Sequence, residues 1–143
     1  MIKRSIKKFI ASDKHPMVIL IDENRIPLFY PNVYAMQNIQ NNRVICNLEK
    51  YGDILTVKRP VEHWCYFKTN EQRAHFLQVV QDKGYEIINQ SKNDENENPY
   101  SAQIGRIDSV NLASINQVTW ELLDLCIENG GEYDGWETSV IRN

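Results

Sequence analysis

Hydrophobic positions recur with helical spacing in three stretches of the chain, and strand-like runs lie between these stretches. From Asn32 to Tyr51 the spacing predicts a helix. Val61 to Phe67 is rich in β-forming residues and predicts a strand. Thr69 and Gln72 then have the spacing of a capping box, which predicts the start of a second helix, and Gly84 is placed to end it.

The rest of the chain continues the alternation of strands and helices. The further predicted elements are a strand at Tyr85–Ile88, a polar loop at Gln90–Pro99, a strand at Tyr100–Ile107, a helix capped by Asp108 or Ser109 that runs to Asn129, and a strand at Glu132–Ile141. The order strand, helix, strand, strand, helix, strand is that of the split βαβ arrangement. We therefore predict an α+β, ferredoxin-like βαββαβ sandwich, with a four-stranded antiparallel sheet and two helices on one face.

The first forty residues are less regular, and we predict an N-terminal extension over residues 1–41 before a domain over residues 42–143. The basic segment Ile2–Ile10 has Ile2, Ile6, Phe9 and Ile10 at helical spacing, which favours a short helix docked on the domain over one on a membrane surface. Met17–Ile21 and Ile26–Tyr30 predict the two strands of a hairpin, with a turn at Asp22–Arg25.

Composition narrows the class of protein. The chain has 143 residues, of which 42% are hydrophobic, so it can bury a core. The net charge of −3 argues against a broad nucleic-acid footprint. Three cysteines without a Cys-x-x-Cys pair indicate a reducing compartment and buried thiols. Because no segment approaches ~20 apolar residues, and the basic start lacks the apolar stretch of a signal peptide, we expect a cytoplasmic protein without a membrane partner.

The last predicted helix carries two apolar stripes where a surface helix needs one. The first stripe belongs to the core and contains Leu112, Ile115, Val118, Leu122, Leu125 and Cys126. Trp120, Leu123 and Ile127 form the second stripe, which either the N-terminal residues or another molecule must cover. We favour cover from within the chain, and a protein-binding surface is the alternative.

Alternation along the strand Val61–Phe67 places His63 on one face and Trp64 and Tyr66 on the other. If the helices cover the His63 face, Trp64 and Tyr66 stand on an open sheet face, where aromatic rings can stack RNA bases. The acidic net charge, and a third strand without the aromatic, glycine-rich motif of RNA-recognition modules, weigh against this. Cover by the N-terminal segment or by a subunit partner is the other interpretation.

His63 with Glu62, Glu132 and Asp134 is the one cluster that suggests a metal or acid–base site. Neighbouring strand residues point to opposite faces, so Glu62 and His63 cannot readily serve one centre. We expect His63 to be hydrogen-bonded to a neighbouring carboxylate. Without a Ser-His-Asp order, a phosphate-binding glycine loop or a zinc spacing, the sequence predicts no catalytic residue, no metal and no cofactor.

Two runs carry a resemblance to a known family: Arg59-Pro-Val-Glu-His-Trp64 and Glu132-Tyr-Asp-Gly-Trp136. From about Asn42 to Val140 the chain resembles the RraB-like family, the regulators of ribonuclease E activity B or ribonuclease E inhibitors. The family's fold is the ferredoxin-like one expected above. The positions that match the family motif are Gly52, Asp53, Arg59, Val61, His63, Trp64, Tyr66, Phe67 and Gly135.

The resemblance implies a non-catalytic protein that binds an endoribonuclease of the ribonuclease E type and restrains RNA cleavage. Together with the second stripe, it suggests a protein-binding surface made of Trp120, Leu123, Ile127, Glu132, Tyr133, Asp134 and Trp136. Two alternatives stay open: an RNA-binding module that stacks bases on Trp64 and Tyr66, and a domain that forms a homodimer.

Overall fold

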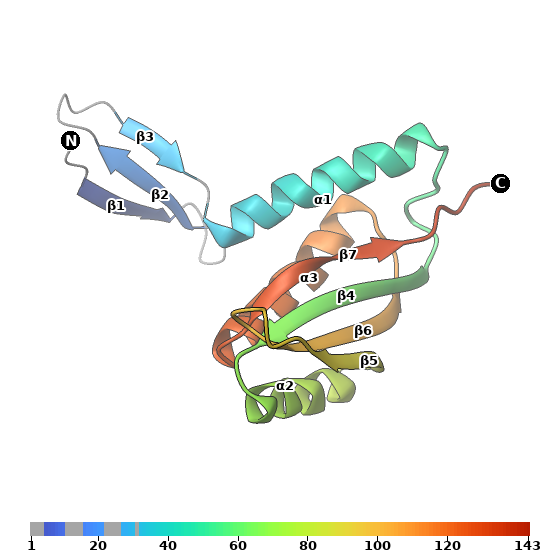
Figure 1. Ribbon diagram of the computed structural model, residues 1–143. Coiled ribbons are helices and arrows are strands. Elements are labelled where there is room, and N and C mark those ends of the chain that lie inside the picture. The colour runs from blue at the N-terminus through green and yellow to red at the C-terminus, as the bar shows by residue number, and fades with distance from the viewer. Residues whose placement is uncertain (1–4, 11–15, 22–26, 31) are drawn as a thin grey trace. The chain divides into compact units, whose positions relative to one another are not determined.

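The computed structural model describes residues 5–10, 16–21, 27–30 and 32–143, with side chains from residue 32 onward (Figure 1). The chain divides into two compact units, Met1–Asn42 and Arg43–Asn143. The first unit contains a three-stranded antiparallel sheet in the order β1-β2-β3, followed by the first part of helix α1. Its elements are β1 (Ser5–Ile10), β2 (Pro16–Ile21), β3 (Pro27–Tyr30) and the start of α1 (Val33–Lys50).

The predicted hairpin is confirmed, because β2 and β3 pair antiparallel with Val18 opposite Tyr30. Its turn at Asp22–Arg25 lies outside the described residues. The prediction of a helix near the N-terminus is wrong, because Ser5–Ile10 is strand β1, paired along its whole length with β2. A short isolated helix is marginal in water, whereas this pairing satisfies the backbone groups of β1 along one side.

The second unit contains the predicted ferredoxin-like arrangement. Its four strands are all antiparallel and lie in the order β5-β6-β4-β7, with one helix between β4 and β5 and one between β6 and β7 (Figure 1). The α+β fold class is therefore confirmed. The elements are β4 (Arg59–Phe67), α2 (Asn70–Asp82), β5 (Glu86–Lys92), β6 (Tyr100–Asp108), α3 (Leu112–Glu128) and β7 (Glu132–Thr138).

Local sequence signals place most element ends. The capping box of Thr69 and Gln72 is present at the start of α2, as predicted. The predicted cap of α3 is wrong, because the N-cap is Asn111. Asp108 instead ends β6, where it accepts a hydrogen bond from Arg106. β5 runs to Lys92, into the predicted loop, since its last residues pair with β6, and β7 ends at Thr138, three residues before the predicted end.

The main core lies between the sheet and helices α2 and α3. In Figure 1, β7 and β4 pass in front of α3, so the viewer looks onto the sheet face that these helices leave open. The buried residues of the core come from β4, β6 and both helices: Cys65, Phe67, Phe76, Leu77, Val80, Tyr85, Ala102, Ile104, Val118, Leu122 and Cys126. The helices thus cover the face of β4 that carries His63.

A second apolar cluster joins the latter half of α1 to α3 and to the edge of the sheet. It contains Val44, Ile45, Leu48, Leu55, Val61, Val110, Ile115 and Trp136. Cys65 and Cys126 are buried as predicted, but the same prediction is wrong for Cys46, which is exposed on α1. Within the part of the chain that the structure describes, no helix is long and apolar enough to cross a membrane.

A buried arginine fastens the linker between α1 and β4 to the C-terminal segment. Arg59 Nη1 donates to Asp53 Oδ2 at 2.6 Å, and the two side chains are 1% and 0% exposed. The same guanidinium donates to three backbone carbonyls, those of Ile54, Val57 and Ser139. Asp53 Oδ2 also accepts the backbone N–H of Ile141 at 2.9 Å. Every nitrogen of the guanidinium is therefore engaged.

Burial alone would raise the pKa of Asp53. The hydrogen bond from Arg59, the backbone N–H of Ile141 and the charge of Arg59 outweigh it, so the pKa lies below its ordinary value of 3.8. Because the folded-state pKa is lowered, this carboxylate contributes stability that is present above 3.8 and is lost as the pH falls through the folded-state value.

Replacing Arg59 with Ala leaves the Asp53 carboxylate buried without its partner. We expect Arg59→Ala to lower the free energy of unfolding by about 3–5 kcal/mol, measured by urea denaturation at neutral pH. Lys83→Ala is the matched control, since Lys83 pairs with Glu121 at the surface at 3.3 Å, and it should cost less than about 0.5 kcal/mol. Equal costs for the two variants would contradict this account.

Candidate functional site

The run Tyr133-Asp-Gly-Trp136 contains a β-bulge in β7. Trp64 lies opposite Gly135 and Cys65 lies opposite Tyr133, so Asp134 is the extra residue between these pairs. Gly135 has a φ of 129°, a backbone conformation that favours glycine. The extra residue shifts the alternation of side chains along β7 by one position. Tyr133 and Trp136 therefore both face the helices, although they are three positions apart. Both side chains are half-buried, and Trp136 belongs to the cluster with α1.

Tyr133 is the hydrogen-bond partner of His63. The distance from Tyr133 Oη to His63 Nδ1 is 2.7 Å, and the tautomer of the imidazole decides which group donates. Burial raises the pKa of Tyr133 well above 10.0. Burial, and secondarily the charge of Arg106, lower the pKa of His63 to about 3, so the imidazole is neutral at physiological pH. The expectation that a carboxylate is the partner of His63 is wrong.

The predicted cluster of His63 with carboxylates does not form at this site. His63 is fully buried on the helix side of the sheet, whereas Glu62 and Glu132 lie on the other side by strand alternation. Asp134 is exposed in the bulge. The described residues contain no group of three His, Cys, Asp or Glu side chains that could hold a metal ion. His63 is therefore part of the packed core, where its partner is Tyr133.

Trp64 and Tyr66 lie on the open face of the sheet, as the alternation predicts once the helices cover the His63 face. Each is half-buried. Their surroundings are acidic: Glu132 is opposite Tyr66, and Glu62 is opposite Glu137. Burial raises the pKa of Tyr66, and the charges of Asp134 and Glu132 raise it further. No motif in the sequence indicates that Glu62 and Glu137 are neighbours, because only the register of β7 on β4 places them opposite each other.

The second stripe of α3 is not uniformly exposed. Leu123 is 7% exposed and therefore covered within the protein, whereas Ile127 is 52% exposed and Trp120 is half-buried. The residues suggested for protein binding thus fall into two groups. Ile127, Glu132 and Asp134 are exposed and Trp120 is partly so, while Leu123, Tyr133 and Trp136 pack inward to different degrees.

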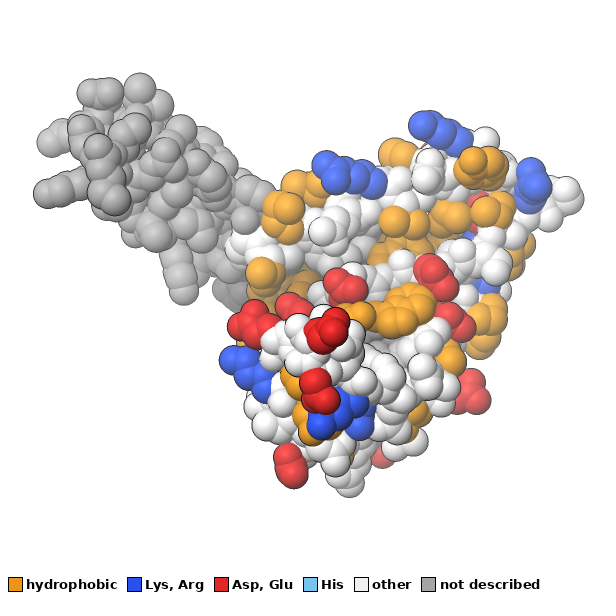
Figure 2. All heavy atoms as spheres, viewed as in Figure 1, with side chains coloured by type: hydrophobic (Ala, Val, Ile, Leu, Met, Phe, Trp, Pro, Cys, Tyr) orange, Lys and Arg blue, Asp and Glu red, His pale blue; other side chains and the backbone are white. Residues whose placement is uncertain are grey.

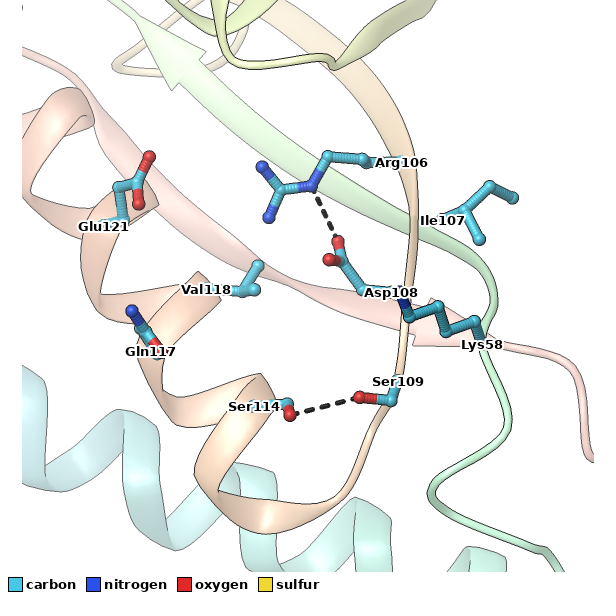
Figure 3. Close-up of a pocket in the computed structure, with 9 residues that line it drawn as sticks. All are labelled: Lys58, Arg106, Ile107, Asp108, Ser109, Ser114, Gln117, Val118 and Glu121. Atoms are coloured by element: carbon cyan, nitrogen blue, oxygen red, sulfur yellow. Dashed lines mark hydrogen bonds and ion pairs between the residues drawn. The ribbon is translucent and has the colours of Figure 1, made fainter.

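A small pocket of about 270 Å³ lies between β6 and the first half of α3 (Figure 3). Figure 3 shows Arg106 and Asp108 paired at its wall, at 2.9 Å, and Ser109 donating to Ser114 at 3.1 Å. Glu121, also in the lining, pairs with Lys83. Because much of the lining's charge and hydrogen-bonding capacity is used within the protein, the pocket does not point to a particular ligand.

The fold and this site define the class: a small ferredoxin-like α+β domain whose open sheet face carries aromatic and acidic side chains. Residues 38–138 match the family described as Regulator of ribonuclease activity B, RraB. The match covers more than half of the chain and includes every element from β4 to β7, so the chain belongs to this family. None of the curated proteins compared with the chain matches it.

The buried, neutral His63 predicts a pH dependence of stability. Unfolded His63 binds a proton below about 6.5, whereas folded His63 resists protonation until about 3. Lowering the pH between these values therefore favours the unfolded chain, by up to about 1.4 kcal/mol per pH unit. Urea denaturation between pH 6.5 and about 4.5, above the range of most carboxylates, measures this slope.

We expect His63→Gln to flatten this slope and His75→Gln to keep it, because His75 is exposed on α2. The two variants remove the same side chain from a buried and an exposed position. A slope that persists unchanged in His63→Gln would contradict the assignment of the pH dependence to His63.

Proposed function

We propose that this protein is a non-catalytic regulator that binds an endoribonuclease of the ribonuclease E type in the cytoplasm and restrains its cleavage of RNA. The observation that carries the proposal is membership of the Regulator of ribonuclease activity B family, over residues 38–138. The family is described as a regulator of ribonuclease activity, and a regulator of that kind acts by binding. The burial of His63 away from the nearby carboxylates supports a role without catalysis.

The exposed members of the suggested surface supply the contacts in this proposal. Ile127 lies at the end of α3, and Glu132 and Asp134 follow in β7. The helix ends between Ile127 and Glu132, where Gly130 has a φ of 70°, so the chain passes from α3 into β7 within a few residues. Leu123, Tyr133 and Trp136 then act indirectly, by holding α3 and β7 in place.

Two alternatives, RNA binding through Trp64 and Tyr66 and formation of a homodimer, have weaker support. A phosphate backbone approaching the two aromatic rings would meet Glu62, Glu132 and Glu137, and this repulsion opposes the counterion release that drives nucleic-acid binding. A homodimer would place these like charges against their own copies unless the two faces were offset.

Affinity capture from the host's nuclease-treated lysate should recover the ribonuclease. In a purified system, the protein should slow cleavage of a labelled RNA in proportion to the complex formed. Ile127→Glu should weaken the complex about tenfold or more without unfolding the protein, because Ile127 is 52% exposed and the change places a charge in the contact.

Glu95→Gln, in the exposed loop between β5 and β6, is the control and should leave both readouts unchanged. A protein that recovers no ribonuclease and leaves the cleavage rate unchanged would contradict the proposed function.

A further inference from the structure

The open face of the sheet combines aromatic rings with several carboxylates. Strand alternation and register place on it the residues that we call the acidic aromatic face: Glu62, Trp64, Tyr66, Glu132 and Glu137, with Asp134 in the adjoining bulge. Figure 2, viewed from this side, shows acidic side chains around a patch of hydrophobic ones. The chain has 16 Lys and Arg, so a shortage of cations does not explain this concentration of acids.

The carboxylates of this face have no cationic partners within the described residues. The ion pairs of that part of the chain include Arg59–Asp53, Lys83–Glu121, Lys92–Asp94 and Arg106–Asp108, and none of these involves the face. Glu62 accepts a hydrogen bond from the Gln103 amide at 2.9 Å and lies directly opposite Glu137. Like charges directly opposite each other on a sheet repel and are destabilising. A cationic group bound between Glu62 and Glu137 would remove this repulsion.

The aromatic rings stand beside open space. Gly135 lies opposite Trp64, and a Cβ atom built at this glycine would meet no atom within 4 Å beyond those of its chain neighbours. On the other side, the Ile88 side chain lies over Gly105, where a Cβ atom would approach Ile88 Cδ1 to 2.7 Å. The face therefore offers a half-buried indole and phenol, open space at Gly135 on β7, an apolar side chain over Gly105 on β6, and carboxylates nearby.

We propose that the acidic aromatic face is the docking site for a segment of the ribonuclease that is rich in arginine and lysine. This inference rests on the proposed function and adds the surface and the chemistry of the partner. A guanidinium can lie over an aromatic ring while it donates hydrogen bonds to a neighbouring carboxylate, and the face supplies both groups side by side. An RNA strand finds the same rings but is repelled by the same carboxylates.

The test compares two double variants with a matched control. Glu62→Gln/Glu137→Gln removes two charges from the face and keeps the side-chain shapes. Trp64→Ala/Tyr66→Ala removes the rings. Glu95→Gln/Glu97→Gln removes two charges from the exposed loop between β5 and β6, so its net charge equals that of the first variant. Urea denaturation verifies that each variant folds.

The measurement is the affinity for the purified ribonuclease at about 50 and 200 mM salt. We expect the affinity of the Gln double variant to fall about tenfold, with a larger fall at the lower salt concentration than at the higher one. We expect the affinity of the Ala double variant to fall about 30-fold. The loop control should bind as the unchanged protein does. An array of overlapping peptides that covers the ribonuclease sequence should show binding at its basic segments, and this binding should be lost in both face variants.

Three outcomes would overturn the inference. If the ribonuclease binds the face variants as tightly as the unchanged protein, the proposed function stands and the docking site is elsewhere. If the unchanged protein binds neither the ribonuclease nor its peptides, both proposals fail. If instead the face binds a labelled single-stranded RNA, or mediates a homodimer in sedimentation that the face variants dissociate, the face belongs to that other partner.

Discussion

The ion pair between Arg59 and Asp53 fastens the chain beyond the end of β7 to the linker that precedes β4. It joins the linker after α1, the first residue of β4 and the C-terminal segment through side-chain and backbone hydrogen bonds. β7 is an edge strand with β4 as its neighbour in the sheet. Fastening the chain beyond its end therefore limits fraying from that side. Because Arg59 also begins β4, one guanidinium holds the start of the central strand and the end of the edge strand together.

The bulge at Asp134 is the second constraint, because it decides which side chains of β7 face the helices. A regular strand would place Tyr133 and Trp136 on opposite faces. With the extra residue, Tyr133 reaches His63 and Trp136 reaches the cluster with α1, while Gly135 leaves the opposite face open beside Trp64. The bulge thus places the aromatic side chains of β7 on the helix side of the sheet and leaves its acidic side chains on the open side.

The order and class of the elements could be predicted from the sequence because the periodicity changes clearly between β4, α2 and α3, and because Thr69 and Gln72 mark a helix start unambiguously. The bulge could not be predicted, since a glycine in a strand is also compatible with regular pairing. The error at His63 has the same origin: without the bulge, the alternation gives no reason for Tyr133 to reach it. Near the N-terminus, the spacing of four apolar residues fitted a helix, but pairing with β2 made Ser5–Ile10 a strand.

The neutral interior and the charged exterior depend on each other through β4. His63 and Trp64 are adjacent, so any shift of register by one residue would bring the imidazole among the carboxylates and the indole into the core. That shift is costly, because it would break the hydrogen bond between His63 and Tyr133 and would carry the Glu62 carboxylate into the apolar core. The hydrogen bond in the core thereby also fixes which side chains the open face presents to a partner.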